Sequence, residues 1–277
     1  MCGDLVGIHF FNVMDIQKIK ADKNLAHVVP LMFFLIFLGG LGFLVDGPFD
    51  SFFRDHSDLA WWRRDPFQWI YPVQTFLCFG LLVFWWNHYE FSWSLRNVLM
   101  GVVLGVVGIG FWLLPTQAYE WMGFASDAEV PVWLRRLGVQ ERLDGFDARI
   151  FGVDGRAFDS VADWVSLCLR FLRAMVVVAV VEEIFWRGFL MRWLLNRDGN
   201  YWKVPFGKAS WLTYGVTTLA FMLVHAPVDY AGAIAFGTTM YFCAIWTRSL
   251  GACVVMHGVA NLLMGWYAVT TGKLGLW

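Results

Sequence analysis

Charged residues are scarce in this sequence: they make up 16% of its 277 residues, whereas 58% are hydrophobic. A soluble domain typically contains about 25% charged residues, so this composition excludes an ordinary soluble fold and indicates a polytopic membrane protein. The 17 tryptophans suit such a protein, because tryptophan collects at membrane–water interfaces. The basic residues stand singly and the net charge is −1, which argues against a nucleic-acid partner.

Paired cysteines are also missing. The five cysteines include no C-x-x-C pair and occur at positions 2, 78, 168, 243 and 253. This pattern excludes a disulfide framework and a zinc knuckle, and indicates small apolar packing residues. The N-terminal residues lack an apolar run that ends at a cleavage site, so we expect no signal peptide.

Apolar segments long enough to cross a bilayer recur along the chain. A membrane-spanning helix needs about 20 mostly apolar residues. This criterion predicts spans at residues 28–45, 66–86, 97–114, 161–195, 211–225, 230–246 and 251–269. The expected fold class is therefore all-α, a polytopic transmembrane helical bundle. It has seven spans, or eight if the long segment 161–195 splits.

The chain divides into three regions. Residues 1–114 are expected to form an N-terminal tail and three peripheral transmembrane helices. Residues 115–160 are predicted to form a polar interhelical loop, with a short interfacial helix at 133–137. Residues 161–277 would then form a four-helix core. The basic residues of the connection 192–208 favour its placement in the cytoplasm.

Two adjacent carboxylates and an arginine interrupt one of the most apolar stretches of the chain. They are Glu182, Glu183 and Arg187, in the sequence VVEEIFWRGFL. A charged side chain near the middle of a bilayer costs roughly 2.5–3.5 kcal/mol on insertion scales, so such residues usually mark a functional site. Glu183 and Arg187 have the i,i+4 spacing of an intrahelical salt bridge. Glu182 lies about 140° around the helix from Arg187 and faces it less directly.

Two histidines lie at the end of a predicted span or within one. His225 closes the fifth span, and Phe221, four residues earlier, is expected to stack on its ring. His257 lies within the seventh span, with Asn261 one helical turn later on the same face. The other four histidines (8, 27, 56 and 88) fall in tails, loops or span ends and are predicted to be interfacial.

These motifs, E-E-x-x-x-R, F-x-x-x-H and H-x-x-x-N, occur in that order on apolar helices. The sequence EEIFWR, FMLVH and HGVAN resembles the CAAX prenyl protease and bacteriocin-processing (Abi) family of integral-membrane peptidases. The resemblance extends from about Val161 to the C-terminus. The strings EEIFWRGFLMRW and HGVANLLMGWYAVTTGKLGLW are most similar to a bacterial subgroup that accompanies exosortase sorting systems.

Peptide hydrolysis without a nucleophilic side chain needs an activated water and donors for the oxyanion. Our hypothesis makes Glu182 the general base and lets His225 share the water. His257 and Asn261 would donate to the developing oxyanion, and Glu183 and Arg187 would fix the helix around Glu182. The family resemblance implies the same roles for these residues.

Three alternatives remain open. Glu182, His225 and His257 could bind Zn²⁺ with Glu183 as base, although no H-E-x-x-H spacing occurs and metal-free chemistry without a cofactor is favoured. The chain could be a non-catalytic membrane scaffold or an immunity-type protein. A transporter with a proton relay would show paired halves with broken helices, and the sequence has no such internal symmetry.

The resemblance also implies a substrate and a location. The substrate would be a membrane-associated protein, cut near its C-terminus at the lipid bilayer, and prenyl specificity does not carry over to bacterial members. The location would be the bacterial inner (cytoplasmic) membrane, with a functional link to an exosortase system.

Overall fold

The computed structural model describes residues 15–45, 47–53, 60–149 and 160–277, and these contain helices but no strand. The single long helices are α2 (Lys23–Val45), α5 (Phe67–Phe84), α6 (Leu95–Met122), α11 (Trp211–Leu223), α12 (Tyr230–Thr247) and α13 (Leu250–Thr271). Another long helix is continuous and consists of α8 (Val161–Leu172), a π-helical segment (Arg173–Val178), α9 (Ala179–Glu183), a second π-helical segment (Ile184–Leu190) and α10 (Met191–Leu195). Short helices α3 (Asp50–Phe53), α4 (Trp61–Arg64) and α7 (Val132–Arg135) lie in the connections, with 3₁₀ turns at Trp86–His88, Asp127–Glu129, Tyr201–Lys203, Pro227–Asp229 and Leu274–Leu276.

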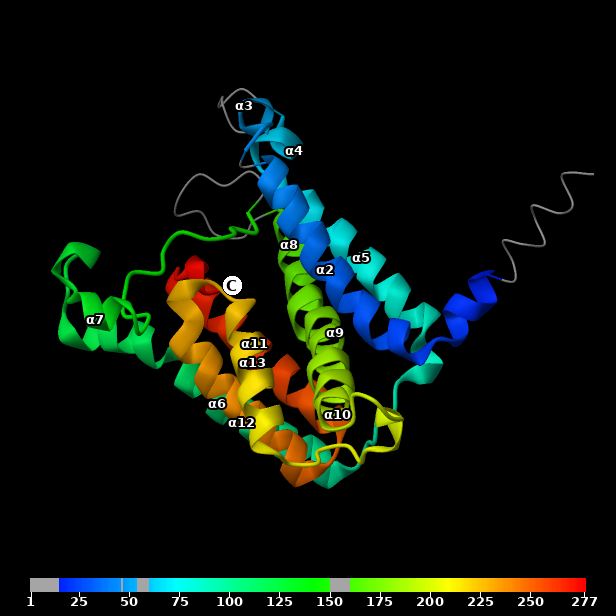
Figure 1. Cartoon of the computed structure of the whole chain (residues 1–277). Coiled ribbons are helices and arrows are strands. Elements are labelled where there is room, and N and C mark those ends of the chain that lie inside the picture. Colours follow the sequence, from blue (N-terminus) through cyan, green and yellow to red (C-terminus); the bar gives the residue numbers. More distant parts are fainter. Residues whose placement is uncertain (1–14, 46, 54–59, 150–159) are drawn as a thin grey trace, which may run out of the picture.

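The α8–α10 helix stands between two groups of helices (Figure 1). On one side α2 packs against α5, and α2 also contacts α9 and the second π segment. On the other side α6 packs along α12 and α13, α11 packs on α12, and α13 contacts α9 and the first π segment. The two groups converge near α10 and diverge toward α8 (Figure 1).

The all-α polytopic bundle predicted from the sequence is confirmed. In the part of the chain that the structure describes, six helices are long and apolar enough to cross a membrane, including the continuous helix Val161–Leu195. That segment does not split, so an eighth span is not formed there. The predicted span 211–225 corresponds to α11, whose 13 residues are fewer than a full crossing requires.

The predicted polar loop 115–160 begins later than expected. Helix α6 continues through Pro115 and ends at Met122, where Gly123 adopts a left-handed φ of 70°. Membrane helices tolerate internal proline when neighbouring groups satisfy the freed carbonyl, and α2 and α5 also contain internal prolines. The expected interfacial helix at 133–137 corresponds to the single turn of α7.

Serine side chains mark where several helices begin. A serine hydroxyl accepts a hydrogen bond from a first-turn backbone N–H at the start of α6, α8, α11 and α13, at Ser94, Ser160, Ser210 and Ser249. Such N-caps satisfy backbone donors that have no partner within the helix. At α8 the cap is a reciprocal capping box with Asp163.

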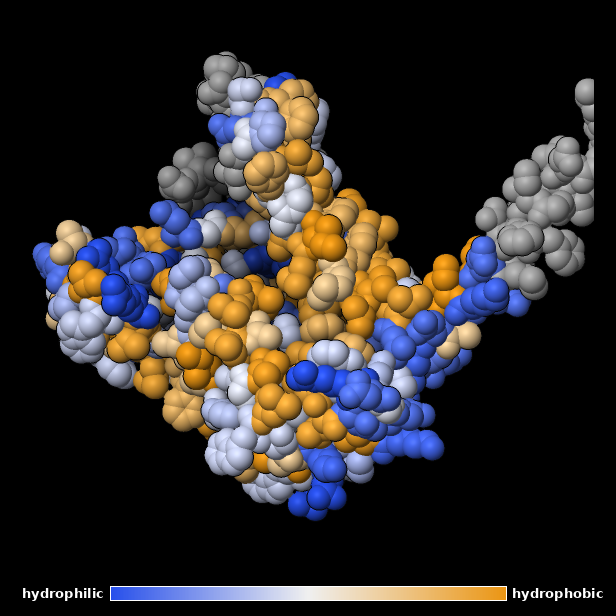
Figure 2. Space-filling view, viewed as in Figure 1, coloured by the Kyte–Doolittle hydropathy of each residue, from blue (hydrophilic) through white to orange (hydrophobic). Residues whose placement is uncertain are grey.

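Apolar side chains cover much of the outside of the bundle. Large exposed residues on α6 include Leu99, Val103 and Phe111. Figure 2 shows hydrophobic residues along the sides of both helix groups and hydrophilic residues gathered around α7 and beyond the end of α10. A hydrophobic belt with polar ends is the surface that a bilayer requires.

One of the histidines predicted to be interfacial is buried. His27 is 2% exposed, donates from Nδ1 to the Lys23 carbonyl and packs against the rings of Tyr89 and Trp202. It also lies beside Gly188 of the second π segment. His88 binds the carbonyl of Lys20 in an exposed position, whereas positions 8 and 56 fall outside the described residues.

Candidate active site

Both glutamates lie on the short α9, between the two π-helical segments. A π turn shifts the hydrogen bonding from i→i+4 to i→i+5, and such turns inside long helices are frequent at functional sites. The π geometry was not predicted from the sequence. It places Glu182 and Glu183 where the helix contacts α13 and α2.

Glu183 binds both an arginine and a histidine. Its Oε1 accepts a hydrogen bond of 3.1 Å from Arg187 Nη1 and lies 2.9 Å from His257 Nδ1. Glu183 is 0% exposed, Arg187 1% and His257 4%. The predicted intrahelical salt bridge is therefore present, and it extends to His257 on α13, which sequence spacing does not reveal.

Glu182 has different surroundings. Its Oε2 is buried and has no hydrogen-bond partner. The guanidinium of Arg173, on the same helix, interacts electrostatically with its carboxylate. Buried polar atoms in folded proteins are nearly always hydrogen-bonded, so an unpartnered carboxylate oxygen at this depth is suited to receive a substrate or a water.

The ring of His225 is oriented by the end of α11. Its Nδ1 lies 2.7 Å from the carbonyl oxygen of Phe221, and its backbone N–H donates to the carbonyl of Met222. A carbonyl oxygen can only accept, so Nδ1 carries a proton and the neutral ring keeps a lone pair on Nε2. The backbone thereby selects the tautomer in which Nε2 can act as a base.

Phe221 lies at the centre of the three motifs. Its ring centroid is 4.5 Å from that of His225 and 6.5 Å from that of His257, and the guanidinium of Arg187 lies 5.4 Å above it. The predicted stacking of Phe221 on His225 is present. The aromatic ring also holds Arg187 through a cation–π contact.

Two further aromatic residues complete the walls of the site. Trp112 of α6 meets the His225 ring edge-on at 5.3 Å, and Phe236 of α12 meets the His257 ring at 5.5 Å. Sequence reasoning missed both, because neither shares a helix with a motif residue. Among 17 tryptophans and 26 phenylalanines, the sequence contains no signal that distinguishes these two.

Asn261 joins α13 to the first π segment. Its Nδ2 donates to the carbonyl of Ala174 at 2.7 Å. The two helices approach closely beside it, since a Cβ on Gly258 would lie 2.7 Å from the Met175 carbonyl oxygen. A glycine is required at 258 for this approach, which sets the position of the Asn261 amide.

The structure thus connects four of the six predicted site residues. Glu183, Arg187 and His257 form one hydrogen-bonded set, and Phe221 connects it to His225. Asn261 is held one turn beyond His257. Glu182, the sixth, lies next to Glu183 on α9.

Residues 164–263 match the family model described as type II CAAX prenyl endopeptidase, Rce1-like. The matched segment contains all six of these residues. This segment, 100 of the 277 residues, is therefore similar to a family of proteases. Together with the six apolar helices found among the described residues, this similarity indicates an integral, multi-pass membrane protein. No curated protein and no solved structure gave a significant match to the chain.

Proposed function

We propose that this protein is an intramembrane endopeptidase that hydrolyses a peptide bond in a membrane-associated protein. The contrast between the two adjacent glutamates supports this proposal most directly. Glu183 is bound by Arg187 and His257 through Oε1, whereas the Glu182 side chain forms no hydrogen bond with any residue that the structure describes. Oε2 lacks a partner in both carboxylates. One carboxylate thus has a structural role, and its neighbour is available for chemistry.

In the first step Glu182 takes a proton from a water molecule, which attacks the scissile carbonyl carbon. His225 accepts a hydrogen bond from the same water through Nε2, the nitrogen left free when Nδ1 donates to Phe221. General-base assistance of this kind contributes typically about 10²–10⁴-fold in rate. The aromatic rings of Phe221 and Trp112 hold the imidazole in place.

The oxyanion is stabilised from α13. His257 is held through Nδ1 by Glu183, so Nε2 is the nitrogen that faces the substrate, and it donates when the ring is protonated. Asn261 donates one amide proton to Ala174 and has a second available for the oxyanion. Preorganised donors of this kind each contribute roughly 10²–10³-fold in kcat. Glu182 then returns its proton to the leaving amine.

The proposal favours metal-free chemistry over the zinc alternative. Within the described ranges, no three histidine, cysteine, aspartate or glutamate side chains lie close enough together to hold a metal ion. The nitrogen of His257 that approaches a carboxylate is bound to Glu183, which also binds Arg187. We therefore propose a base and oxyanion donors among these residues and no metal ion.

Replacement of Glu182 by glutamine tests the proposal. Glu182→Gln keeps the shape and removes the base, so we expect substrate cleavage to fall about 10²–10⁴-fold. Unfolding of the purified protein should change little, because Glu182 Oε2 has no partner to lose. Glu141→Gln, an exposed carboxylate outside the membrane helices, is the matched control and should cleave like the wild type.

A non-catalytic scaffold makes the opposite prediction. In that case Glu182→Gln would leave the membrane proteome unchanged, with any effect confined to stability. A comparison of membrane proteomes from wild-type and Glu182→Gln strains should reveal uncleaved precursors if the protein is a peptidase. Precursors that carry exosortase sorting signals would support the expected link to that system in a bacterial inner membrane.

A further inference from the structure

Two adjoining cavities lie between the start of α11 and the end of α12. The first has a volume of about 510 Å³ and the second about 550 Å³. Ala209, Phe242 and Ile245 line both, so the two form one continuous groove. Each volume falls in the range of small-molecule sites, about 300–1,000 Å³.

The groove is separate from the candidate active site. Its first cavity is lined by Trp211 and Tyr214 at the beginning of α11, whereas His225 follows the end of that helix. The 13 residues of α11 between them span about 20 Å. An occupant of the groove is therefore not the peptide bond under attack.

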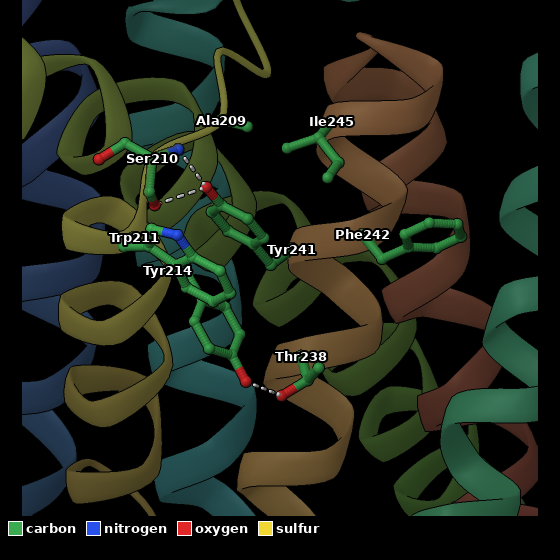
Figure 3. A pocket seen from close by; sticks show the side chains of 8 residues that line it. All are labelled: Ala209, Ser210, Trp211, Tyr214, Thr238, Tyr241, Phe242 and Ile245. Atoms are coloured by element: carbon green, nitrogen blue, oxygen red, sulfur yellow. Dashed lines mark hydrogen bonds between the residues drawn. The ribbon is translucent and has the colours of Figure 1, made fainter.

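The polar atoms of the first cavity already bind one another. Figure 3 shows the Tyr241 hydroxyl bonded to Ser210 and the Tyr214 hydroxyl bonded to Thr238. Thr238 donates in turn to the carbonyl of Ile234. Because these bonds use most of the hydroxyl capacity, the cavity suits a hydrocarbon chain better than a peptide with its own amides.

The second cavity has a cationic rim. It is lined by Lys208, before α11, and by Arg248, after α12. Both side chains are exposed, and neither forms an ion pair with any residue that the structure describes. Two unpaired cations at the mouth of an apolar groove suit a ligand with an anionic group attached to a hydrocarbon chain.

Local backbone geometry holds this rim in place. Gly207 has a φ of 71°, and a Cβ there would lie 2.3 Å from the Ala244 carbonyl oxygen, so the loop before α11 packs directly on the last turn of α12. Arg248 itself ends α12 in the left-handed region, with a φ of 50°. A residue without glycine's freedom rarely adopts this conformation.

The depth of the groove matches the membrane interface. Trp211 lines the first cavity and is 88% exposed, and Trp246 lines the second and is 50% exposed. Tryptophan side chains prefer the headgroup level. The cationic rim would then lie among lipid headgroups, and the first cavity would point toward the acyl chains.

From these features we infer that the groove binds an anionic phospholipid. The phosphate lies between Lys208 and Arg248, and one acyl chain occupies the cavity beside Tyr214 and Tyr241. Basic pockets between transmembrane helices commonly bind anionic headgroups. The site is independent of the proposed peptidase chemistry and would exist on the protein whether or not it cleaves a substrate.

The test measures lipid binding to the purified full-length protein in detergent. Dioleoyl phosphatidylglycerol and dioleoyl phosphatidylcholine differ in headgroup charge but share the same chains. Two cations at the headgroup should give phosphatidylglycerol an apparent Kd about tenfold to thirtyfold lower, measured by native mass spectrometry and by the shift in Tm. The double variant Lys208→Gln/Arg248→Gln should lose this preference, and Ala209→Phe, which fills the junction of the cavities, should weaken binding of both lipids.

The matched control is Arg197→Gln/Lys203→Gln. It removes two positive charges from the loop that contains Lys208 but none from the lining of the groove. It should bind like the wild type. Equal affinity of the wild type for the two lipids, or equal loss in the control, would overturn the inference. So would full binding by Ala209→Phe, or a Tm shift from inorganic phosphate as large as that from the lipid. Glu182→Gln should bind the lipid normally, so failure of the peptidase proposal and failure of the lipid site are distinguishable.

Discussion

The ion pair between Glu183 and Arg187 allows a quantitative test of how the site is held together. Glu183→Gln keeps the shape of the side chain and can still accept a hydrogen bond from His257 Nδ1. It leaves Arg187, which is 1% exposed, as a buried charge without its counter-ion. Removal of one partner of a buried pair costs about 3–5 kcal/mol, so the free energy of unfolding should fall by that amount.

A double-mutant cycle separates the pair from the rest of the helix. Arg187→Met should cost a similar amount, because it leaves the Glu183 carboxylate unpaired. In the double variant no unpaired charge remains, so most of the loss should be recovered and the coupling energy should amount to several kcal/mol. Unfolding would be followed by tryptophan fluorescence during titration of the micelles with a denaturing detergent.

The control is an ion pair whose carboxylate is exposed at the protein surface. Glu120, with a side chain 46% exposed, pairs with Lys273, and Glu120→Gln should cost less than about 1 kcal/mol. If Glu183→Gln were no more destabilising than Glu120→Gln, the pair would not be a buried one. The structural role assigned to Glu183 would then be wrong.

Two further outcomes follow from the same geometry. Gly258→Ala places a Cβ 2.7 Å from the Met175 carbonyl oxygen, so it should destabilise the protein by about 1–3 kcal/mol and reduce cleavage by displacing Asn261. The control is Gly110→Ala, whose Cβ meets nothing within 4 Å. It should be neutral or slightly stabilising in the same unfolding assay. Treatment with a strong chelator should leave cleavage unchanged, and metal analysis should find less than one bound zinc per chain; loss of activity that zinc alone restores would contradict the metal-free mechanism.

The sequence predicted those structural features that depend on composition or on the spacing of nearby residues. The helical bundle, the Glu183–Arg187 pair and the contact of Phe221 with His225 all follow from composition or from an i,i+4 relation. The length of α11 and the continuation of α6 through Pro115 were not predicted, because a hydropathy pattern does not show where a turn begins or whether neighbours compensate a proline.

Contacts between residues on different helices could not be predicted from the sequence. The bond from His257 to Glu183 joins residues 74 positions apart, and the bond from Asn261 to Ala174 spans 87. Each requires a particular packing of α13 on the glutamate helix. Burial of His27 has the same origin, since its neighbours Tyr89 and Trp202 come from distant parts of the chain.

The two π-helical segments on either side of α9 let the glutamate helix contain extra residues with little change in the directions that its flanking side chains face. Each wider turn accommodates residues that regular α-geometry would spread around the axis at about 100° apiece. Deletion of one residue within Arg173–Val178 would let that stretch relax to α-geometry, and the residues before it, Arg170 included, would keep nearly the same direction relative to Glu182. The π turns therefore allow an extra residue between Arg170 and Glu182 while each group keeps its side of the bundle.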